Sequence, residues 1–271
     1  MAVVSAVGFA PRPATRWAIG GTVGVVFAIP LLSTLLYTLR DDTTGGLTLA
    51  HWAGLFDSAN QHILTPLWTG LGNSLVLAVL TVLIVEGVLA PTMILINLRL
   101  PQLRRAFEFV VLLPISIPAI VLVVGLSPIY LVIGRNLGTG AWTLAFAYGI
   151  TVLPFAFRSI QASIDAIDVA TLSEAARASG ANWATTVLLV LVPNLRGGLI
   201  AAALISTAVV LGEFTIASLL NRQVLQTALV VVSKMDAYAS AMFTLLSLAF
   251  AFGLLVVIGR LGRISLRKDA L

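Results

Sequence analysis

The chain has 271 residues, of which 59% are hydrophobic and only 10% are charged. A soluble domain of this length could not bury so much apolar surface, so the composition indicates a protein whose solvent is the lipid bilayer. The absence of cysteine excludes a disulfide framework, a thiolate metal site and a thiol nucleophile. The formal net charge is +5, but the basic residues lie scattered at the ends of apolar runs, which argues against nucleic-acid binding.

Six long apolar runs predict an all-α polytopic membrane protein with six transmembrane helices in a single domain, residues 1–271. The predicted spans are 17–39, 71–98, 106–133, 141–157, 185–211 and 241–261. The first span is too long for the core of a signal peptide and is interpreted as a retained helix. It follows a terminal segment, 1–16, and with an outer loop it fills residues 17–70, before a core region at 71–265. Pro114, Pro118 and Pro128 predict a kink in the third span.

The distribution of the basic residues predicts the orientation of these spans. An even number of spans places both termini on one side of the membrane, and twelve of the sixteen basic residues fall on that side. The twelve are Arg12, Arg16, Arg99, Arg104, Arg105, Arg158, Arg177, Arg196, Arg260, Arg263, Arg267 and Lys268. The other four are Arg40, Arg135, Arg222 and Lys234. Because cytoplasmic loops carry the excess of Lys and Arg, both termini are predicted to be cytoplasmic.

A polar stretch between the fourth and fifth spans, residues 165–184, is written as a short helix. Thr171 precedes Glu174 by three residues, the spacing of a capping box that satisfies two backbone N–H groups. Ala175, Ala176 and Ala178 favour a helix and leave room for another surface to approach closely. Gly180 predicts the end of this helix through a positive φ, and Asn182 is expected to cap the next one.

This stretch resembles the EAA loop of the membrane subunits of bacterial ABC importers. The family pattern is Glu-Ala-Ala, three residues, Gly, nine residues and Ile-x-Leu-Pro. Glu174, Ala175, Ala176 and Gly180 match it, Pro193 falls in register, and Val190 and Val192 replace the usual Ile and Leu. A surface helix that merely joins two spans is the alternative, but Glu-Ala-Ala and Pro193 in register favour the motif.

The resemblance implies a type I importer permease fold and a coupling helix from about residue 172 to residue 180. Glu174, Ala175, Ala176, Arg177 and Gly180 would dock in a groove of an ATPase, while Pro193 would let the fifth span bend. The implied partners are an ATPase dimer, a second permease chain that is usually different, and an extracytoplasmic solute-binding protein. The chain lacks a Walker A sequence, so ATP and Mg²⁺ would bind to the ATPase and this chain would have no cofactor and no catalytic residue of its own.

Two further sequence features are similar to the spermidine/putrescine-type branch of this family, close to its shorter second permease. These are Asn73-Ser74 near the start of span two and Leu211 to Phe214 at the end of span five. That branch also contains permeases for iron, thiamine, opines and phosphonates. The resemblance covers residues 70–265 and implies a multi-pass protein of the bacterial cell membrane.

Three residues are candidates for the translocation path. Glu86 lies near the middle of span two, where a carboxylate faces either a cavity or a neighbouring span to which it donates a structural hydrogen bond when protonated. Glu213 ends span five, where cavity lining is favoured over a plain interfacial carboxylate. Asn73 either lines the same path or caps span two, and capping is favoured. Two acidic groups favour a cationic solute such as a polyamine.

Other classes of function are weighed against this one. His51 and His62 sit in one outer loop with a spacing that fits no usual metal site, and nothing resembles a nucleophile–base pair, which argues against an enzyme. A secondary transporter driven by an ion gradient could use Glu86 and Glu213 as proton sites. It would have no use for an EAA loop, however, and would usually show inverted repeats.

Overall fold

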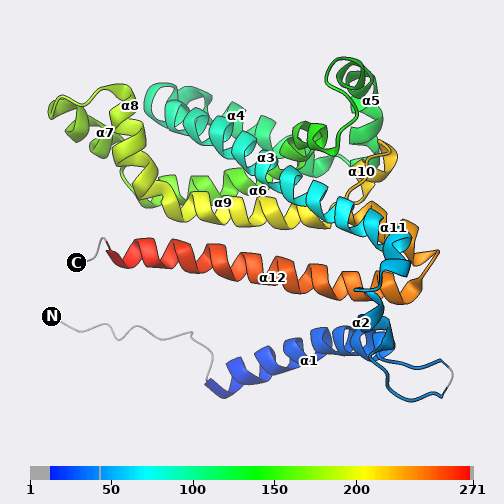
Figure 1. Ribbon diagram of the computed structural model, residues 1–271. Coiled ribbons are helices and arrows are strands. Elements are labelled where there is room, and N and C mark those ends of the chain that lie inside the picture. Colours follow the sequence, from blue (N-terminus) through cyan, green and yellow to red (C-terminus); the bar gives the residue numbers. More distant parts are fainter. Residues whose placement is uncertain (1–12, 43, 269–271) are drawn as a thin grey trace.

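The computed structural model describes residues 13–42 and 44–268, and within this part side chains are described except at 13, 258, 259 and 261–268. Six helical stretches there are long and apolar enough to cross a bilayer, which confirms the predicted all-helical, six-span fold. They are Ala14–Thr38, Ser58–Arg99, Ala119–Asn136, Ala141–Ala166, Trp183–Gly212 and Ala237–Val257. Figure 1 shows five of these helices running lengthwise along the molecule, whereas Ala119–Asn136 is turned across this direction at one end.

The α-helices number twelve in the described residues. In chain order they are α1 (Pro13–Thr38), α2 (Ala50–Gly54), α3 (Gln61–Arg99), α4 (Arg104–Leu112), α5 (Ala119–Asn136), α6 (Ala145–Ala166), α7 (Val169–Ala178), α8 (Trp183–Thr185), α9 (Val192–Gly212), α10 (Thr215–Leu219), α11 (Leu225–Ser233) and α12 (Ala237–Lys268). Short 3₁₀ turns precede α3, α4 and α6, a fourth follows α4, and a π-helix, Thr186–Leu191, joins α8 to α9.

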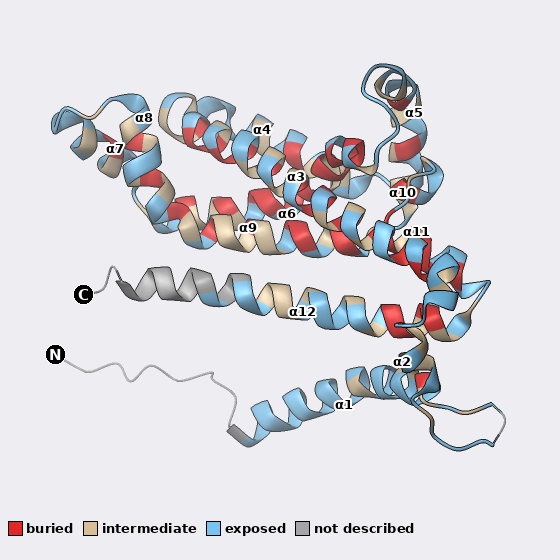
Figure 2. Cartoon of the chain, viewed as in Figure 1, coloured by how far each residue is buried: buried red, intermediate tan, exposed pale blue. Residues whose placement is uncertain are grey.

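Helices α3, α6 and α9 form the centre of the molecule and pack pairwise against one another. Their facing sides carry fully buried side chains such as Leu77, Tyr148 and Leu195, and Figure 2 shows this buried stripe in red. The approach of α9 to α6 is close because residue 198 is glycine: a β-carbon there would lie 2.7 Å from the Ser159 carbonyl oxygen. A glycine at this position therefore allows the two backbones to touch.

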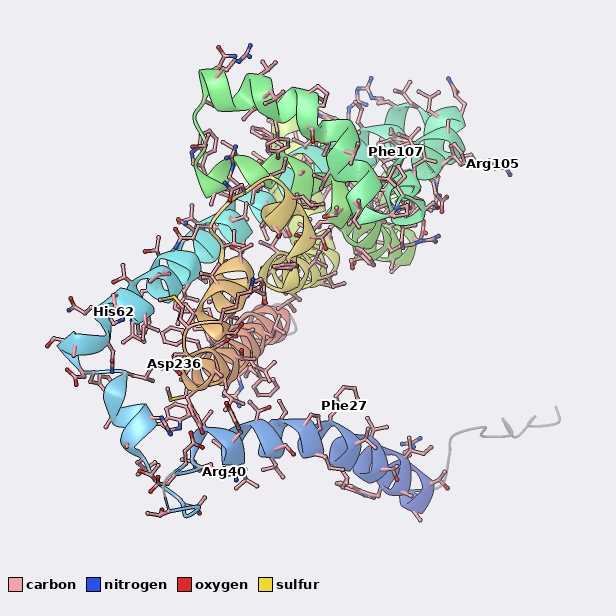
Figure 3. The ribbon with its side chains drawn as sticks, turned by 90° about the vertical axis from the view of Figure 1, so that its right-hand side faces the viewer. Phe27, Arg40, His62, Arg105, Phe107 and Asp236 are labelled. Carbon is pink, nitrogen blue, oxygen red and sulfur yellow. The ribbon has the colours of Figure 1, made fainter. Side chains whose placement is uncertain are left out.

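Helix α1 stands apart from this core and packs mainly on α12. Almost all of its described side chains are exposed, among them Phe27 at 69%, and Figure 3 shows α1 running away from the other helices. Its C-terminal end is fixed by an aromatic stack in which the Tyr37 and Tyr238 rings lie 4.7 Å apart and nearly parallel. The exposed apolar length of α1 suits contact with lipid or with another membrane helix.

The two ends of the bundle differ. The beginning of α1, the end of α3, the helix α7 and the end of α12 lie at one end, and α2, α10 and α11 lie at the other (Figure 1). This arrangement fits the predicted even number of crossings, because the stretch with the EAA pattern shares its end of the bundle with both terminal helices. Helix α7, the beginning of α1 and the end of α12 thus lie at the same end of the bundle.

Two predictions about the spans are wrong. The third span is not a single kinked helix: α4 ends at Leu112, a 3₁₀ turn follows, and extended backbone at Ile117 and Pro118 separates it from α5. Pro118 forces the residue before it out of the α region, so the helix breaks instead of bending. The second long helix begins at Gln61, about ten residues earlier than predicted, so Asn73 does not cap it.

Candidate coupling loop and translocation path

The helix with the EAA pattern, α7, begins differently from the prediction. Its N-cap is Asp168, whose Oδ1 accepts from the Thr171 backbone N–H (3.0 Å) and whose Oδ2 accepts from the Thr171 hydroxyl (2.7 Å). The predicted capping box between Thr171 and Glu174 is therefore wrong, because an earlier carboxylate already satisfies the first free N–H groups. The Thr171 hydroxyl, and then its backbone N–H, lower the pKa of the Asp168 carboxyl below its ordinary value.

The end of α7 agrees with the prediction. Gly180 has a φ of +85°, Ala181 donates its backbone N–H to the Ala176 carbonyl, and Gly180 donates to Arg177. This pair of bonds is a Schellman motif, which requires a residue tolerant of the left-handed region. Asn182 then caps α8 as predicted, because its Oδ1 accepts from the Thr185 backbone N–H at 2.8 Å.

The outward face of α7 carries the residues of the EAA pattern. Glu174, Ala175 and Arg177 are exposed, Ala176 is half-buried, and Val169 and Ser173 are buried against the rest of the chain. The helix packs on the π-helix and on α3. Its small alanine side chains leave a surface that another helix or groove can approach closely, with one carboxylate and one guanidinium beside it.

Pro193 marks an irregular joint between α7 and the core. It lies two residues after the end of the π-helix Thr186–Leu191 and occupies the second position of α9. Proline has no N–H to donate to the preceding turn, so the chain there does not keep regular α-helical bonding. π-helical turns occur often at functional sites. The sequence indicated a bend near Pro193, but it gave no sign of the wider helical turn that precedes it.

Three contacts that the sequence did not reveal surround the base of the loop. Arg99 lies over the Trp183 ring, 5.6 Å from its centroid. Arg104 binds Asp165 at 2.7 Å, and Arg158 lies 3.6 Å from Glu108. These pairs join the end of α3 and the short helix α4 to the segments on either side of α7. They are exposed pairs, so each contributes modestly, but together they fix the position of α7 relative to the core.

The acidic candidate Glu86 lies on the central helix α3. It is half-buried, and its Oε1 is shielded from solvent without a hydrogen-bond partner among the described residues. The hydroxyls of Thr81 on α3 and of Tyr148 on α6 are buried and lack partners in the same way. The core formed by α3 and α6 therefore carries polar atoms that a membrane protein would satisfy with a ligand, water or a second chain.

The other two candidates have structural partners. Glu213 follows the last residue of α9 and caps α10: its carboxylate accepts from the backbone N–H groups of Thr215 (2.9 Å) and Ile216 (3.0 Å). Asn73 lies inside α3 and donates to the Gln223 carbonyl at 2.8 Å, while the next residue, Ser74, accepts from the Leu225 N–H at 2.9 Å. Asn73-Ser74 thus holds the connection between α10 and α11 on α3.

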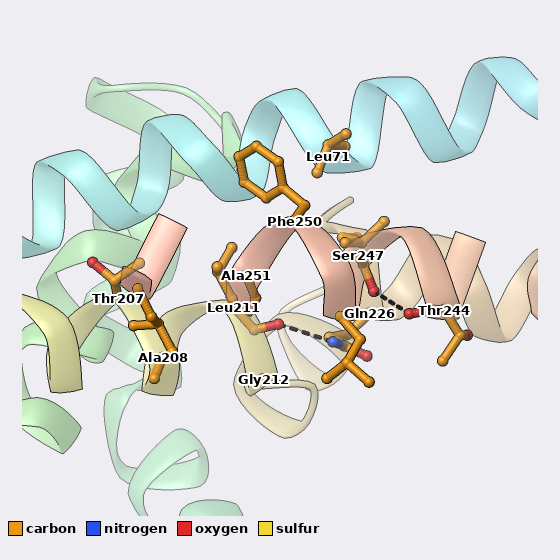
Figure 4. A pocket seen from close by; sticks show the side chains of 13 residues that line it. Leu71, Thr207, Ala208, Leu211, Gly212, Gln226, Thr244, Ser247, Phe250 and Ala251 are labelled. Atoms are coloured by element: carbon orange, nitrogen blue, oxygen red, sulfur yellow. Dashed lines mark hydrogen bonds between the residues drawn. The ribbon is translucent and has the colours of Figure 1, made fainter. Parts of the chain in front are cut away.

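The candidate coupling residues lie in or directly after α7, except Pro193 in α9, whereas Asn73 and Glu86 lie on α3 and Glu213 follows α9. A groove of about 300 Å³ opens between α9, α11 and α12, and Figure 4 shows its mostly apolar lining. It contains Thr207, Gln226 and Phe250, but none of Glu86, Glu213 or Asn73. In the part of the chain with described coordinates, no group of three or more His, Asp or Glu side chains could hold a metal ion.

The fold defines a polytopic helical membrane protein with an exposed short helix, α7, at one end of the bundle. The model of the family described as "Binding-protein-dependent transport system inner membrane component" matches residues 87–263, which include α7, the π-helix and α9. The chain belongs to this family. It is a non-catalytic membrane component of a binding-protein-dependent ABC transport system. A comparison with curated proteins gave no match.

Proposed function

We propose that this chain forms half of the translocation path of an ATP-driven importer and that α7 is its coupling helix. The single observation that carries the proposal is the exposed face of Glu174, Ala175 and Arg177 on a helix whose opposite side is anchored in the fold. An ATPase dimer would hold ATP and Mg²⁺ and would receive α7 in a groove. Nucleotide-driven motion would then reach α9 through the π-helix and Pro193 as a rigid-body tilt.

The remaining partners follow from the family. An extracytoplasmic binding protein would deliver the solute to the end of the bundle that carries α10 and α11. A second, homologous permease chain would complete the path, and the exposed faces of α1 and α12 are available for it or for lipid. The excess of basic residues on the side of α7 supports a cytoplasmic position for α7 and for both termini.

The class of solute is the finer part of the proposal. The sequence favours the spermidine/putrescine branch through Asn73-Ser74 and Leu211 to Phe214, and a polyamine because Glu86 and Glu213 are acidic. The Glu213 carboxylate, however, already accepts two backbone N–H groups, so Glu86 is the candidate with an unsatisfied carboxyl oxygen. The argument for a cationic solute is thereby reduced to one residue, and permeases of the same branch for other solutes fit equally well.

The orientation and the docking of α7 are tested with one set of cysteine variants. Because the natural chain has no cysteine, Ala175→Cys and Ser58→Cys each introduce a single thiol, one on α7 and one at the opposite end of the bundle. A membrane-impermeant maleimide should label the Ser58 variant in intact spheroplasts and the Ala175 variant only in inverted vesicles. Bound ATPase should protect the Ala175 variant and leave the Ser58 variant reactive.

The reverse labelling pattern would place α7 outside the cell and overturn the proposal. Labelling of the Ala175 variant that is unaffected by the ATPase would remove the coupling role while leaving the topology intact.

A further inference from the structure

Two of the four basic residues on the outer side of the membrane meet at one cavity. Arg135 lies in the last turn of α5 and Arg222 follows α10, 87 residues later, yet both line a cavity of about 480 Å³ at the outer end of the bundle. Ser127, Tyr130, Thr139 and Asn221 also line it, and no aspartate or glutamate does. Outer loops of membrane proteins carry few basic residues, so two arginines at one outer cavity indicate a specific function for them.

The backbone holds Arg222 in place before any ligand arrives. Asn221 has a φ of +51°, its N–H donates to the Ser218 carbonyl, and the Arg222 N–H donates to the Ala217 carbonyl. These bonds form a Schellman motif that ends α10. The Arg222 carbonyl accepts in addition from the Thr227 hydroxyl at 3.1 Å. With both backbone groups bonded, the Cα of Arg222 is fixed at the rim of the cavity, which lowers the entropic cost of binding.

The guanidinium of Arg222 has an N–H donor without a hydrogen-bond acceptor among the described residues. Its Nε is shielded from solvent and has no hydrogen-bond partner in the described structure. Within the same residues, neither Arg135 nor Arg222 forms an ion pair, whereas Arg104 and Arg158 on the other side of the membrane do. Two cations that line one cavity repel each other, and an anion bound between them would offset this repulsion. A buried N–H without an acceptor is likewise costly.

The other polar groups of the cavity do not supply this anion. The Tyr130 hydroxyl donates to the Thr143 carbonyl (3.0 Å) and accepts from the Ala147 N–H (3.2 Å), so the ring is fixed as a wall. The nearest acidic residue along the chain, Glu213, is engaged in capping α10. The volume of the cavity lies in the range of sites for small molecules.

We propose that the cavity between α5 and α10 binds an oxyanion through Arg135 and Arg222, and that the solute of this permease carries a carboxylate or phosphate group. This inference rests on the proposed importer function and replaces the polyamine cation that the sequence favoured. Guanidinium groups bind such oxyanions with paired, charge-assisted hydrogen bonds. The solute would meet this site at the outer end of the path, where a binding protein releases it.

The test uses the full-length chain in nanodiscs of phosphatidylcholine, with inorganic phosphate as the probe. Calorimetric titration at constant ionic strength should show phosphate binding that equal concentrations of chloride or spermidine do not reproduce. Arg222→Gln and Arg135→Gln should each weaken binding about tenfold or more, the loss expected for one charge-assisted contact. Lys234→Gln, which removes an exposed outer cation that does not line the cavity, should leave binding unchanged.

Arg222→Lys separates a structural effect from a binding effect. It keeps the positive charge but removes the planar fork, so it should fold normally and still weaken phosphate binding. Equal phosphate affinity of the natural chain and both glutamine variants would overturn the proposal. So would binding that disappears in phosphatidylglycerol nanodiscs, because the cavity would then belong to a lipid headgroup.

A third result would also overturn the proposal. If the natural chain bound no phosphate, and both glutamine variants lost association with the binding protein, the two arginines would be contacts for the binding protein. Failure of the importer function is detected separately, because maleimide labelling at residue 175 and its protection by the ATPase do not involve the cavity.

Discussion

Gly198 on α9 lies so close to Ser163 on α6 that a β-carbon at residue 198 would stand 2.5 Å from the serine Oγ. A β-carbon at the neighbouring Gly197 would have nothing within 4 Å. The two glycines therefore differ in function although the sequence presents them as an identical pair. Gly198 sets the distance between α6 and α9, and Gly197 faces outward.

This difference predicts opposite effects of the same substitution. Gly198→Ala should destabilise the protein by about 1–3 kcal/mol, because the added methyl group forces α6 and α9 apart. Gly197→Ala should be neutral or stabilising by up to about 1 kcal/mol, since alanine favours the helix and meets nothing. Thermal unfolding of both variants and of the natural chain in detergent measures these changes in stability. Equal stabilities would show that α6 and α9 do not approach each other as closely as described.

Gly180 should be needed for docking of the ATPase. Gly180→Val places a branched side chain at φ +85° and should disrupt the end of α7, at a cost of about 1–2 kcal/mol. Gly138→Val is a matched control, because Gly138 has the same φ of +85° but lies in the loop after α5, far from α7. We expect ATPase co-purification to fall for the first variant only. Loss in both would point to general destabilisation.

The cap of α7 should respond to acid. The Thr171 hydroxyl and N–H stabilise the ionised form of Asp168, so its pKa is below the ordinary value in the folded protein. The contribution of this cap is therefore fully present above about pH 4 and is lost as the pH falls through the lowered pKa. Carbon NMR of labelled aspartate should show the pKa rising in Thr171→Val. An unchanged pKa in that variant would show that the hydroxyl has no such effect.

Glu213 should act first as a cap for α10. Glu213→Ala removes the acceptor for two backbone N–H groups and should lower stability by about 1 kcal/mol. Glu213→Gln keeps one carbonyl oxygen in the same place and should lose less. If the alanine variant were as stable as the natural chain in thermal unfolding, the capping role would be dismissed. Glu213 would then again be a candidate for the translocation path, together with Glu86.

The contact of Arg99 with Trp183 should support coupling without being essential to the fold. Trp183→Leu removes an exposed cation–π contact of about 0.5–1 kcal/mol beside α7, so ATPase affinity should fall by less than tenfold. Trp142→Leu is the control, because Trp142 is equally exposed, at 39%, and lies before α6. Trp183→Phe should retain most of the affinity. A fall of the same size in the Trp142 variant would show that the effect is not local to α7.

The sequence by itself determined the six-span helical fold, the helix with the EAA pattern and its end at Gly180. Hydropathy and the need for a positive φ are local properties of the chain, and a bilayer makes them decisive because backbone groups must pair within each helix. The charge of the loops likewise predicted that the ends of the chain and α7 share one side.

Only the tertiary structure decided which polar groups already have partners. Asn73 bonds to the Gln223 carbonyl, which lies 150 residues later, so whether Asn73 faces a path or holds a loop depends on atoms brought close by folding. The same is true of Arg135 and Arg222, which are far apart in the chain and meet only because α10 folds back against α5. The type of a side chain determines which groups it can bind, and its neighbours in space determine whether its hydrogen-bonding atoms are already occupied.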